Sequence, residues 1–213
     1  MYFCTKIKDI MRKSNKEHLY KSAFKLFLLK RFHGVSLSDI EEESGMTRGA
    51  VFYYADNKER LYHNIIEEFV FNKQNTELKY RDYKYDSVKE YIYTYISGIR
   101  QTMQNIAAII GDHITIAKIS CCYISFILEA CDLFPDVKDW YKSNINKDVN
   151  MWGLVLYKGI ESGEINENID VLNCAKQFVF MYYGQALTGV ASTGLNPDIL
   201  MDSMNNLYLL IKK

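Results

Sequence analysis

"SLSDIEEESGMTRGAVFYYADNKERL", residues 36–61, contains two short helix-sized segments separated by a glycine. Ser36 or Ser38 is a suitable N-cap for the first segment, and Glu41 stands three residues after Ser38, as in a capping box. Gly45 is the residue type that ends a helix in the left-handed conformation. The first segment is therefore predicted to be a helix of about two turns.

The second segment starts after a turn of about three residues, with Thr47 as its N-cap. Two short helices around a tight glycine turn predict a helix-turn-helix over about residues 36–55. In that motif the second helix enters the DNA major groove, where Arg48 can bind guanine O6 and N7, and Gly49 permits close backbone approach. Neighbouring hydroxyl and ammonium groups can bind phosphates. The candidate DNA-binding residues are Ser36, Ser38, Thr47, Arg48, Gly49, Phe52, Tyr53, Tyr54 and Lys58. The alternative is a plain helical hairpin within a bundle.

Charge is distributed unevenly along a chain whose formal net charge is zero. Residues 1–60 hold twelve Lys and Arg against eight Asp and Glu, whereas residues 61–213 hold fourteen against eighteen. Nine of those cations lie in the first 31 residues, opposed only by Asp9 and Glu17. This pattern is typical of a segment beside a polyanion, and the alternative is a solvated lysine-rich arm.

The hydrophobic periodicity indicates helix along almost the whole chain. The segment YIYTYISGI, residues 91–99, is rich in residues that favour strands, but its Asp86 and Ser87 flank is typical of a helix start. Clusters of Gly, Pro, Asn and Asp divide the chain into about nine to ten helices. The predicted fold class is therefore all-α.

Composition excludes several classes of protein. The chain has 213 residues, of which 48% are apolar, so it is long enough for one or two domains with a core. The five cysteines and four histidines show no metal-ligand spacing, and no catalytic signature or phosphate-binding glycine loop is present. No secretory signal or membrane-spanning segment is evident. We expect a cytoplasmic protein that is not an enzyme and has no metal or cofactor.

Residues 19–66 resemble the DNA-binding domain of the TetR family of bacterial regulators. The resemblance has no gaps and covers Ala23, Leu26, Phe27, Phe32, Ser36, Leu37, Ile40, Gly45, Thr47, Gly49, Val51, Lys58, Glu59 and Leu61. The sequence departs from the family pattern at Arg31, Glu41, Phe52 and Ala55. Phe52 lacks the phosphate-binding hydroxyl of the tyrosine that is usual at that position.

The resemblance implies a domain organisation and a function. Residues 1–62 would form the helix-turn-helix domain, and residues 63–213 would form a helical domain that binds an inducer and dimerises. The expected function is a dimeric repressor that a small molecule releases from a palindromic operator in double-stranded DNA. The alternatives are a thiol-responsive or constitutive DNA-binding regulator and, least favoured, a helical enzyme or adaptor.

Aromatic and apolar residues of the second domain supply candidates for both of its roles. An apolar or aromatic inducer is expected in a pocket formed from Tyr91, Tyr95, Met103, His113, Tyr123, Phe126, Trp152, Tyr157 and Phe178. The second of two helices expected in residues 149–192, after the break at Gly163 to Asn168, has more apolar surface than one core face needs, and either dimerisation or complete burial explains that excess. The candidate dimer-interface residues are Met181, Tyr182, Tyr183 and Leu187.

Overall fold

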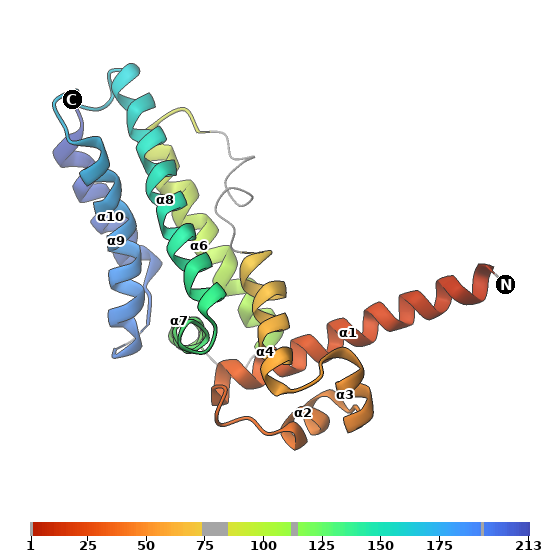
Figure 1. Cartoon of the computed structure of the whole chain (residues 1–213). Coiled ribbons are helices and arrows are strands. Elements are labelled where there is room, and N and C mark those ends of the chain that lie inside the picture. Colours follow the sequence, from red (N-terminus) through yellow and green to blue (C-terminus); the bar gives the residue numbers. More distant parts are fainter. Residues whose placement is uncertain (1, 74–84, 112–114, 193) are drawn as a thin grey trace. The chain divides into compact units, whose positions relative to one another are not determined.

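A computed structural model describes residues 2–73, 85–111, 115–192 and 194–213, and it confirms the all-α prediction (Figure 1). Within these ranges there is no β-strand, only an isolated bridge between Ile165 and Lys212. The elements are α1 (Tyr2–Lys30), α2 (Leu37–Ser44), α3 (Arg48–Tyr54), α4 (Lys58–Ile66), the π-helix η1 (Glu67–Phe71), α6 (Val88–Ile110), α7 (Ile116–Leu133), α8 (Pro135–Glu161), α9 (Val171–Val190) and α10 (Pro197–Ile211). The segment 91–99 lies in α6 and is helical, as predicted.

The chain forms two compact units, and α7 contributes to both of them. The first unit holds residues 1–73 and 125–134, and the second holds residues 74–124 and 135–213. The domain boundary expected at residue 62 thus differs from these units, since the first unit continues through the π-helix and includes the second half of α7. The physical reason is the position of Phe126, which packs in the aromatic core of the first unit.

Caps at both ends define the two helices of the helix-turn-helix. The N-cap of α2 is Ser36, and the capping box is completed by Asp39 rather than by Glu41. Gly45 ends α2 with a φ of 63°, a conformation that residues with a side chain rarely adopt. Thr47 caps α3 by accepting a hydrogen bond from the amide of Ala50 at 3.4 Å. These caps satisfy amides that the first turn of a helix leaves without partners.

The core of the first unit is a group of aromatic rings. The ring of Phe24 stacks on Phe69 at 4.4 Å and meets Phe126 edge-on at 5.4 Å. The ring of Tyr62 contacts Phe27 at 4.7 Å, and its buried hydroxyl donates to the carbonyl of Phe126 at 3.0 Å. Burial raises the pKa of the Tyr62 hydroxyl well above its usual range. A buried tyrosine with a satisfied hydroxyl thus joins α1, α4 and α7.

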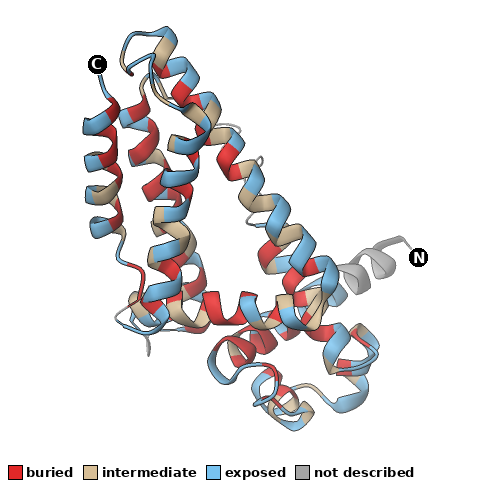
Figure 2. Ribbon diagram, turned by 60° about the vertical axis from the view of Figure 1, so that its left-hand side comes forward, coloured by how far each residue is buried: buried red, intermediate tan, exposed pale blue. Residues whose placement is uncertain are grey.

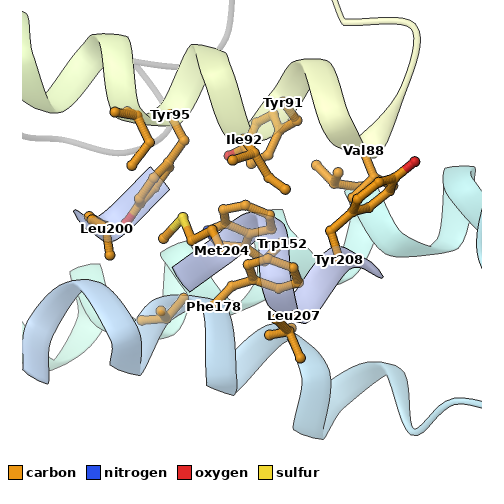
Figure 3. Packing of buried hydrophobic residues seen from close by; sticks show 14 of the residues in the cluster. Val88, Tyr91, Ile92, Tyr95, Trp152, Phe178, Leu200, Met204, Leu207 and Tyr208 are labelled. Atoms are coloured by element: carbon orange, nitrogen blue, oxygen red, sulfur yellow. The ribbon is translucent and has the colours of Figure 1, made fainter. Parts of the chain in front are cut away.

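The second unit is built from α6, α8, α9 and α10 with the first part of α7. Its core centres on Trp152, which stacks on Phe178 at 4.2 Å with an interplanar angle of 2° (Figure 3). Tyr91 and Tyr95 of α6 meet the same indole edge-on at 4.8 and 5.3 Å. Along these helices the residues buried in the core alternate with residues exposed to solvent (Figure 2).

Close backbone packing joins the segment after α9 to α7 within the second unit. A Cβ atom on Gly194 would lie 2.2 Å from the carbonyl oxygen of Ala117, so only glycine fits at that position. The hydroxyl of Ser120 accepts a hydrogen bond from the amide of Leu195 at 3.0 Å. The thiol of Cys121 donates to the carbonyl of Gly189 at 3.2 Å.

Among the described residues, no helix has both the length and the apolar character needed to cross a membrane.

Candidate nucleic-acid interface

The outer face of α3 is the centre of the candidate site. Val51 is buried and holds the helix against its unit, whereas Arg48, Gly49, Phe52 and Tyr53 are exposed. Tyr53 is 58% exposed although it is a large aromatic residue. A Cβ atom on Gly49 would meet no atom within 4 Å, so the space in front of this residue is open. The helix therefore presents two aromatic rings, one guanidinium group and one bare stretch of backbone to the outside.

The side chain of Arg48 is already oriented by a neighbouring carboxylate. Its Nε atom donates to Oε1 of Glu41 at 2.7 Å, and both side chains are at least partly exposed. A guanidinium group has five N–H donors, four of them on the two terminal nitrogens. The contact with Glu41 thus leaves the terminal nitrogens for the acceptor pair of a guanine edge. Glu41, which departs from the family pattern, holds the proposed base-reading residue.

The predicted phosphate donors do not share one environment. The hydroxyl of Ser36 serves the capping box and contacts the carboxylate of Asp39. Hydrogen bonds from Lys30 and from Ser36 keep the pKa of Asp39 well below its usual range. Thr47 is exposed while it caps α3, and Ser38 is exposed at the start of α2. The hydroxyl of Ser36 is thus part of the local fold.

Lys58 has a structural environment that its position in the sequence does not reveal. Its ammonium group donates to the carbonyl oxygens of Phe32 at 3.0 Å and Val35 at 2.9 Å. The same group lies 4.1 Å from the centroid of the Phe32 ring. Both carbonyls lie in the segment between α1 and α2, and that of Phe32 also accepts a hydrogen bond from the amide of Val35 at 3.3 Å. The ammonium expected at a DNA phosphate therefore binds the backbone of the protein itself.

A basic surface of α1 adjoins the recognition helix. The hydroxyl of Tyr54 donates to the carbonyl of Arg12 at 3.3 Å, and the guanidinium of Arg12 lies 4.9 Å from the centroid of the Tyr53 ring. Arg12, Lys13 and Lys16 line a cavity of about 670 Å³ together with Tyr53 and other residues of the first unit. The residue-by-residue prediction did not include these cations. The charge count over the first 31 residues is the signal that finds them.

Of the nine predicted inducer-pocket residues, six are buried in the second unit, one lies outside the described residues, and two have other positions. Tyr91, Tyr95, Met103, Trp152 and Phe178 belong to one buried cluster in the second unit, and Tyr123 is also buried there. His113 lies outside the described residues.

Two pocket candidates have positions that differ from the prediction. Phe126 is part of the core of the first unit, where its ring and carbonyl contact Phe24 and Tyr62. Tyr157 is 58% exposed on α8, because the adjacent residues Val155 and Leu156 occupy the buried face of that helix. Neither residue joins the buried cluster around Trp152.

Some polar atoms of the second unit are buried without a hydrogen-bond partner among the described residues. They include the hydroxyl of Tyr123, Nε1 of Trp152 and Oε1 of Gln185. Burial raises the pKa of the Tyr123 hydroxyl well above its ordinary value, so the group is a neutral donor and acceptor. Leaving such an atom unsatisfied costs about 1–3 kcal/mol.

The predicted dimer-interface residues differ in exposure. Met181, Tyr182 and Tyr183 are half-buried and pack against the core of their own unit. The hydroxyl of Tyr183 lies 3.5 Å from the carboxylate of the buried Asp148. Leu187, in contrast, is 56% exposed.

Further apolar side chains on α8 and α9 share the exposure of Leu187. Leu154 and Tyr157 on α8 and Phe180 on α9 are each more than half exposed. The two helices pack against one another. We call this set, Leu154, Tyr157, Phe180 and Leu187, the α8–α9 apolar face. The list of interface candidates did not include Leu154 or Phe180, although Phe180 belongs to the apolar surface expected on the same helix as Leu187, and Leu154 stands at helical spacing from Tyr157.

Cysteines and acidic residues provide no metal centre in the described part of the chain, where no group of three or more His, Cys, Asp or Glu residues could hold an ion. Cys121, Cys122, Cys131 and Cys174 form no disulfide among the described residues. Burial raises the pKa of the Cys174 thiol, which lowers its reactivity.

Comparisons with known proteins agree with the geometry of the first unit. Residues 19–65 match the family model described as bacterial regulatory proteins, tetR family. An uncharacterised HTH-type transcriptional regulator of Bacillus subtilis, YfiR, is 24% identical over 182 residues, which cover 81% of this chain and 82% of that protein.

Solved structures show the same fold at low sequence identity. A TetR-family regulator from Agrobacterium tumefaciens has a TM-score of 0.66 at 15% identity, with 95% of this chain and 100% of that chain covered. The reduced form of NemR from E. coli has a TM-score of 0.64 at 17% identity, with 94% and 97% covered.

The environment of Lys58 leads to a test by stability rather than by DNA affinity. We expect Lys58→Met to lower the free energy of unfolding by about 1.5–3 kcal/mol, because two carbonyls lose a charged donor. Urea unfolding followed by circular dichroism measures this change, and Arg60→Met, at an exposed position of the same helix, is the control. An unchanged free energy of unfolding with a large loss of DNA affinity would instead identify Lys58 as a phosphate ligand.

Proposed function

We propose that this chain, whose residues 19–65 match the TetR-family DNA-binding domain, is a DNA-binding transcriptional regulator, and that it acts as a ligand-responsive homodimeric repressor. Regulators of this family are not enzymes, which agrees with a sequence that has no catalytic signature. Chromosomal DNA in a bacterium lies in the cytoplasm, so the proposed function is cytoplasmic.

The exposed outer face of α3 is the single observation that carries the proposal. A seven-residue helix that ends in aromatic residues would gain by burying them, yet Phe52 and Tyr53 remain exposed. The oriented guanidinium of Arg48 is suited to two parallel hydrogen bonds with guanine, and the ring of Tyr53 to contact with a thymine methyl group. We infer that α3 lies in the major groove with its N-terminal residues at the base edges.

The α8–α9 apolar face supports a homodimer. Its four large side chains lie on two packed helices, and one copy of this chain leaves each of them more than half exposed. The same face of a second copy, related by a twofold axis, would bury them. Twofold symmetry is the commonest symmetry of soluble oligomers. A twofold dimer also presents two recognition helices to a palindromic site, about 34 Å apart.

The unsatisfied polar atoms of the second unit indicate the chemistry of an effector. The indole of Trp152 contacts Tyr95 at 5.3 Å, and Tyr95 contacts Tyr182 at 6.1 Å. The unpartnered Nε1 of Trp152 thus lies in a connected aromatic cluster, and the unpartnered atoms of Tyr123 and Gln185 lie in the same unit. A small molecule with an aromatic body and both donor and acceptor groups would satisfy them. A thiol-responsive or constitutive regulator remains the alternative. The candidate thiol is then that of Cys121, which donates a hydrogen bond to the carbonyl of Gly189.

The base-reading role of Arg48 is tested on a palindromic site selected from a random duplex library with the wild-type protein. We expect Arg48→Ala to weaken binding to the selected site by about 1–3 kcal/mol and to relax the preference at one base pair per half-site. Fluorescence anisotropy with the selected and a scrambled duplex of equal length measures both affinities. An equal loss on the two duplexes would show that Arg48 contacts only phosphates.

The dimer is tested by a charge placed on the α8–α9 apolar face. Leu154→Asp and Leu187→Asp should each yield monomers at micromolar concentration, because a buried unpaired carboxylate is strongly unfavourable. Leu210→Asp is the matched control, since Leu210 is 83% exposed on α10, a helix that contributes no residue to that face. Light scattering gives the mass, and circular dichroism confirms folding. Folded dimers of both variants would place the interface elsewhere.

The effector site is tested by removing single polar atoms without changing the rings. A compound library is first screened by thermal shift on the wild-type protein. We expect Tyr123→Phe to weaken the best compound about 2- to 10-fold, the effect of one neutral hydrogen bond. Tyr93→Phe, at a half-exposed position of α6, should have no effect. The compound should weaken DNA binding by the same factor by which DNA weakens compound binding. Unaltered DNA affinity with the compound bound would favour the alternative regulator.

A further inference from the structure

We propose that the N-terminal half of α1 is a second DNA-binding surface, in which Arg12, Lys13 and Lys16 bind backbone phosphates next to the base pairs that α3 contacts. This inference rests on the proposed DNA-binding function of α3 and extends it to a part of the chain outside residues 19–65, where the family model matches.

Helix α1 extends well beyond the domain that it helps to build. It begins at Tyr2, but its first buried side chain among the described ones is Leu19. All side chains from Met11 to His18 are exposed, so none of them is buried in the core of the first unit. With a rise of about 1.5 Å per residue, the part of α1 before Leu19 is roughly 25 Å long. Between residues 11 and 18 every residue except Met11 is polar, so this stretch packs on no apolar core and is suited to a polar partner.

Two contacts join this extension to the recognition helix. The guanidinium of Arg12 lies over the ring of Tyr53, and the hydroxyl of Tyr54 binds the carbonyl of Arg12. Tyr53 belongs to the outer face of α3, so Arg12 lies beside the surface that faces the major groove. Both contacts lie within the first unit. These contacts hold Arg12 beside α3, where a DNA strand that borders the major groove would lie.

The cations of α1 differ in whether they already have carboxylate partners. Lys21 pairs with Glu17 at 2.7 Å, Lys25 pairs with Glu43 at 2.7 Å, and Lys30 binds Asp39. For Arg12, Lys13 and Lys16 there is no such ion pair within the described residues. The paired cations lie in the part of α1 that packs on α2, whereas the others lie in the extension. A phosphate can therefore approach the cations of the extension without displacing a carboxylate.

The cavity next to α3 is shaped for groups larger than water. Its three cations come from α1, and its volume is about 670 Å³. Glu67 and Glu68 of the π-helix also line it, so a phosphate is attracted to the α1 wall and repelled from the π-helix wall. Arg12 and Lys16 are four residues apart, which places them on one side of α1 about 6 Å from each other along its axis. Such a row of cations follows a phosphate backbone rather than a single anion.

Duplex DNA suits this surface better than a lipid bilayer does. Among residues 11–18, the stretch that carries Arg12, Lys13 and Lys16, only Met11 is apolar, so this stretch has no hydrophobic face to insert into a membrane. The surface is also continuous with the exposed face of α3, through Tyr53. Phosphate contacts supply affinity and register but no sequence information. The extension should therefore strengthen binding at every site while α3 selects among sites.

The test compares the double variant Lys13→Gln/Lys16→Gln with Lys21→Gln/Lys25→Gln, which removes the same charge from paired positions of the same helix. The probes are two duplexes of about 20 and 40 base pairs around the same wild-type-selected palindrome. Dissociation constants are measured between about 50 and 200 mM KCl. Each phosphate contact contributes about 0.9 to the slope of log K against log salt, so the loss of two cations in each of two protomers lowers the slope by about 3.6.

We expect the Lys13/Lys16 variant to show this smaller slope. The wild type should bind the longer duplex more tightly than the shorter one, and the variant should lose this difference. Its ratio of selected to scrambled binding should stay that of the wild type. The control variant should retain most of the wild-type slope. Equal slopes for the wild type and the Lys13/Lys16 variant, or equal losses in both variants, would overturn the inference while the DNA-binding function stands. A wild-type protein that prefers no duplex over a scrambled one would refute the proposed function itself.

Discussion

The recognition helix is too short to be stable by itself, and the first unit is arranged around that constraint. Isolated helices shorter than about 12–15 residues are marginal in water, whereas α3 has seven residues. Its stability comes from the Thr47 cap, from burial of Val51 and from the short turn after α2 that Gly45 permits. The position of this turn depends on α2. That helix begins at the capping box of Ser36 and Asp39 and packs on α1. The aromatic core beneath these helices supplies the rigidity that DNA reading requires.

Electrostatic pairing within the first unit separates cations that stabilise the fold from cations that remain for a ligand. Lys58 binds backbone carbonyls after α1, and Lys25 and Lys30 join α1 to acidic residues of α2. Such exposed ion pairs add little stability individually, but they neutralise charge where the protein contacts itself. Arg12, Lys13 and Lys16 have no carboxylate partner of this kind among the described residues, so part of the uneven charge of the sequence lies on a surface beside α3.

The second unit divides its aromatic residues between a core and a surface. The stacked pair of Trp152 and Phe178 holds α8 against α9, and the tyrosines of α6 close the cluster from the other side. On the same two helices, Leu154 and Phe180 point away from this core and are exposed. A helix pair with one face in its own core and one apolar face outward is what a twofold helical interface needs. The buried polar atoms of Tyr123 and Trp152 give the core a feature that pure packing does not explain.

Sequence alone determined the helical class, the position of the helix-turn-helix and the glycine turn in it, because caps, turn residues and helical periodicity are local signals. The tertiary structure decided which of two serines caps α2, that Lys58 binds Phe32 and Val35, and that Phe126 packs in the first unit. It also placed Tyr157 on the surface and Trp152 inside, although both are aromatic residues of one helix. Periodicity identifies the residues that share a helix face, but only the neighbouring helices determine whether that face is buried, and neighbours such as Tyr62 and Phe126 are 64 residues apart in the chain.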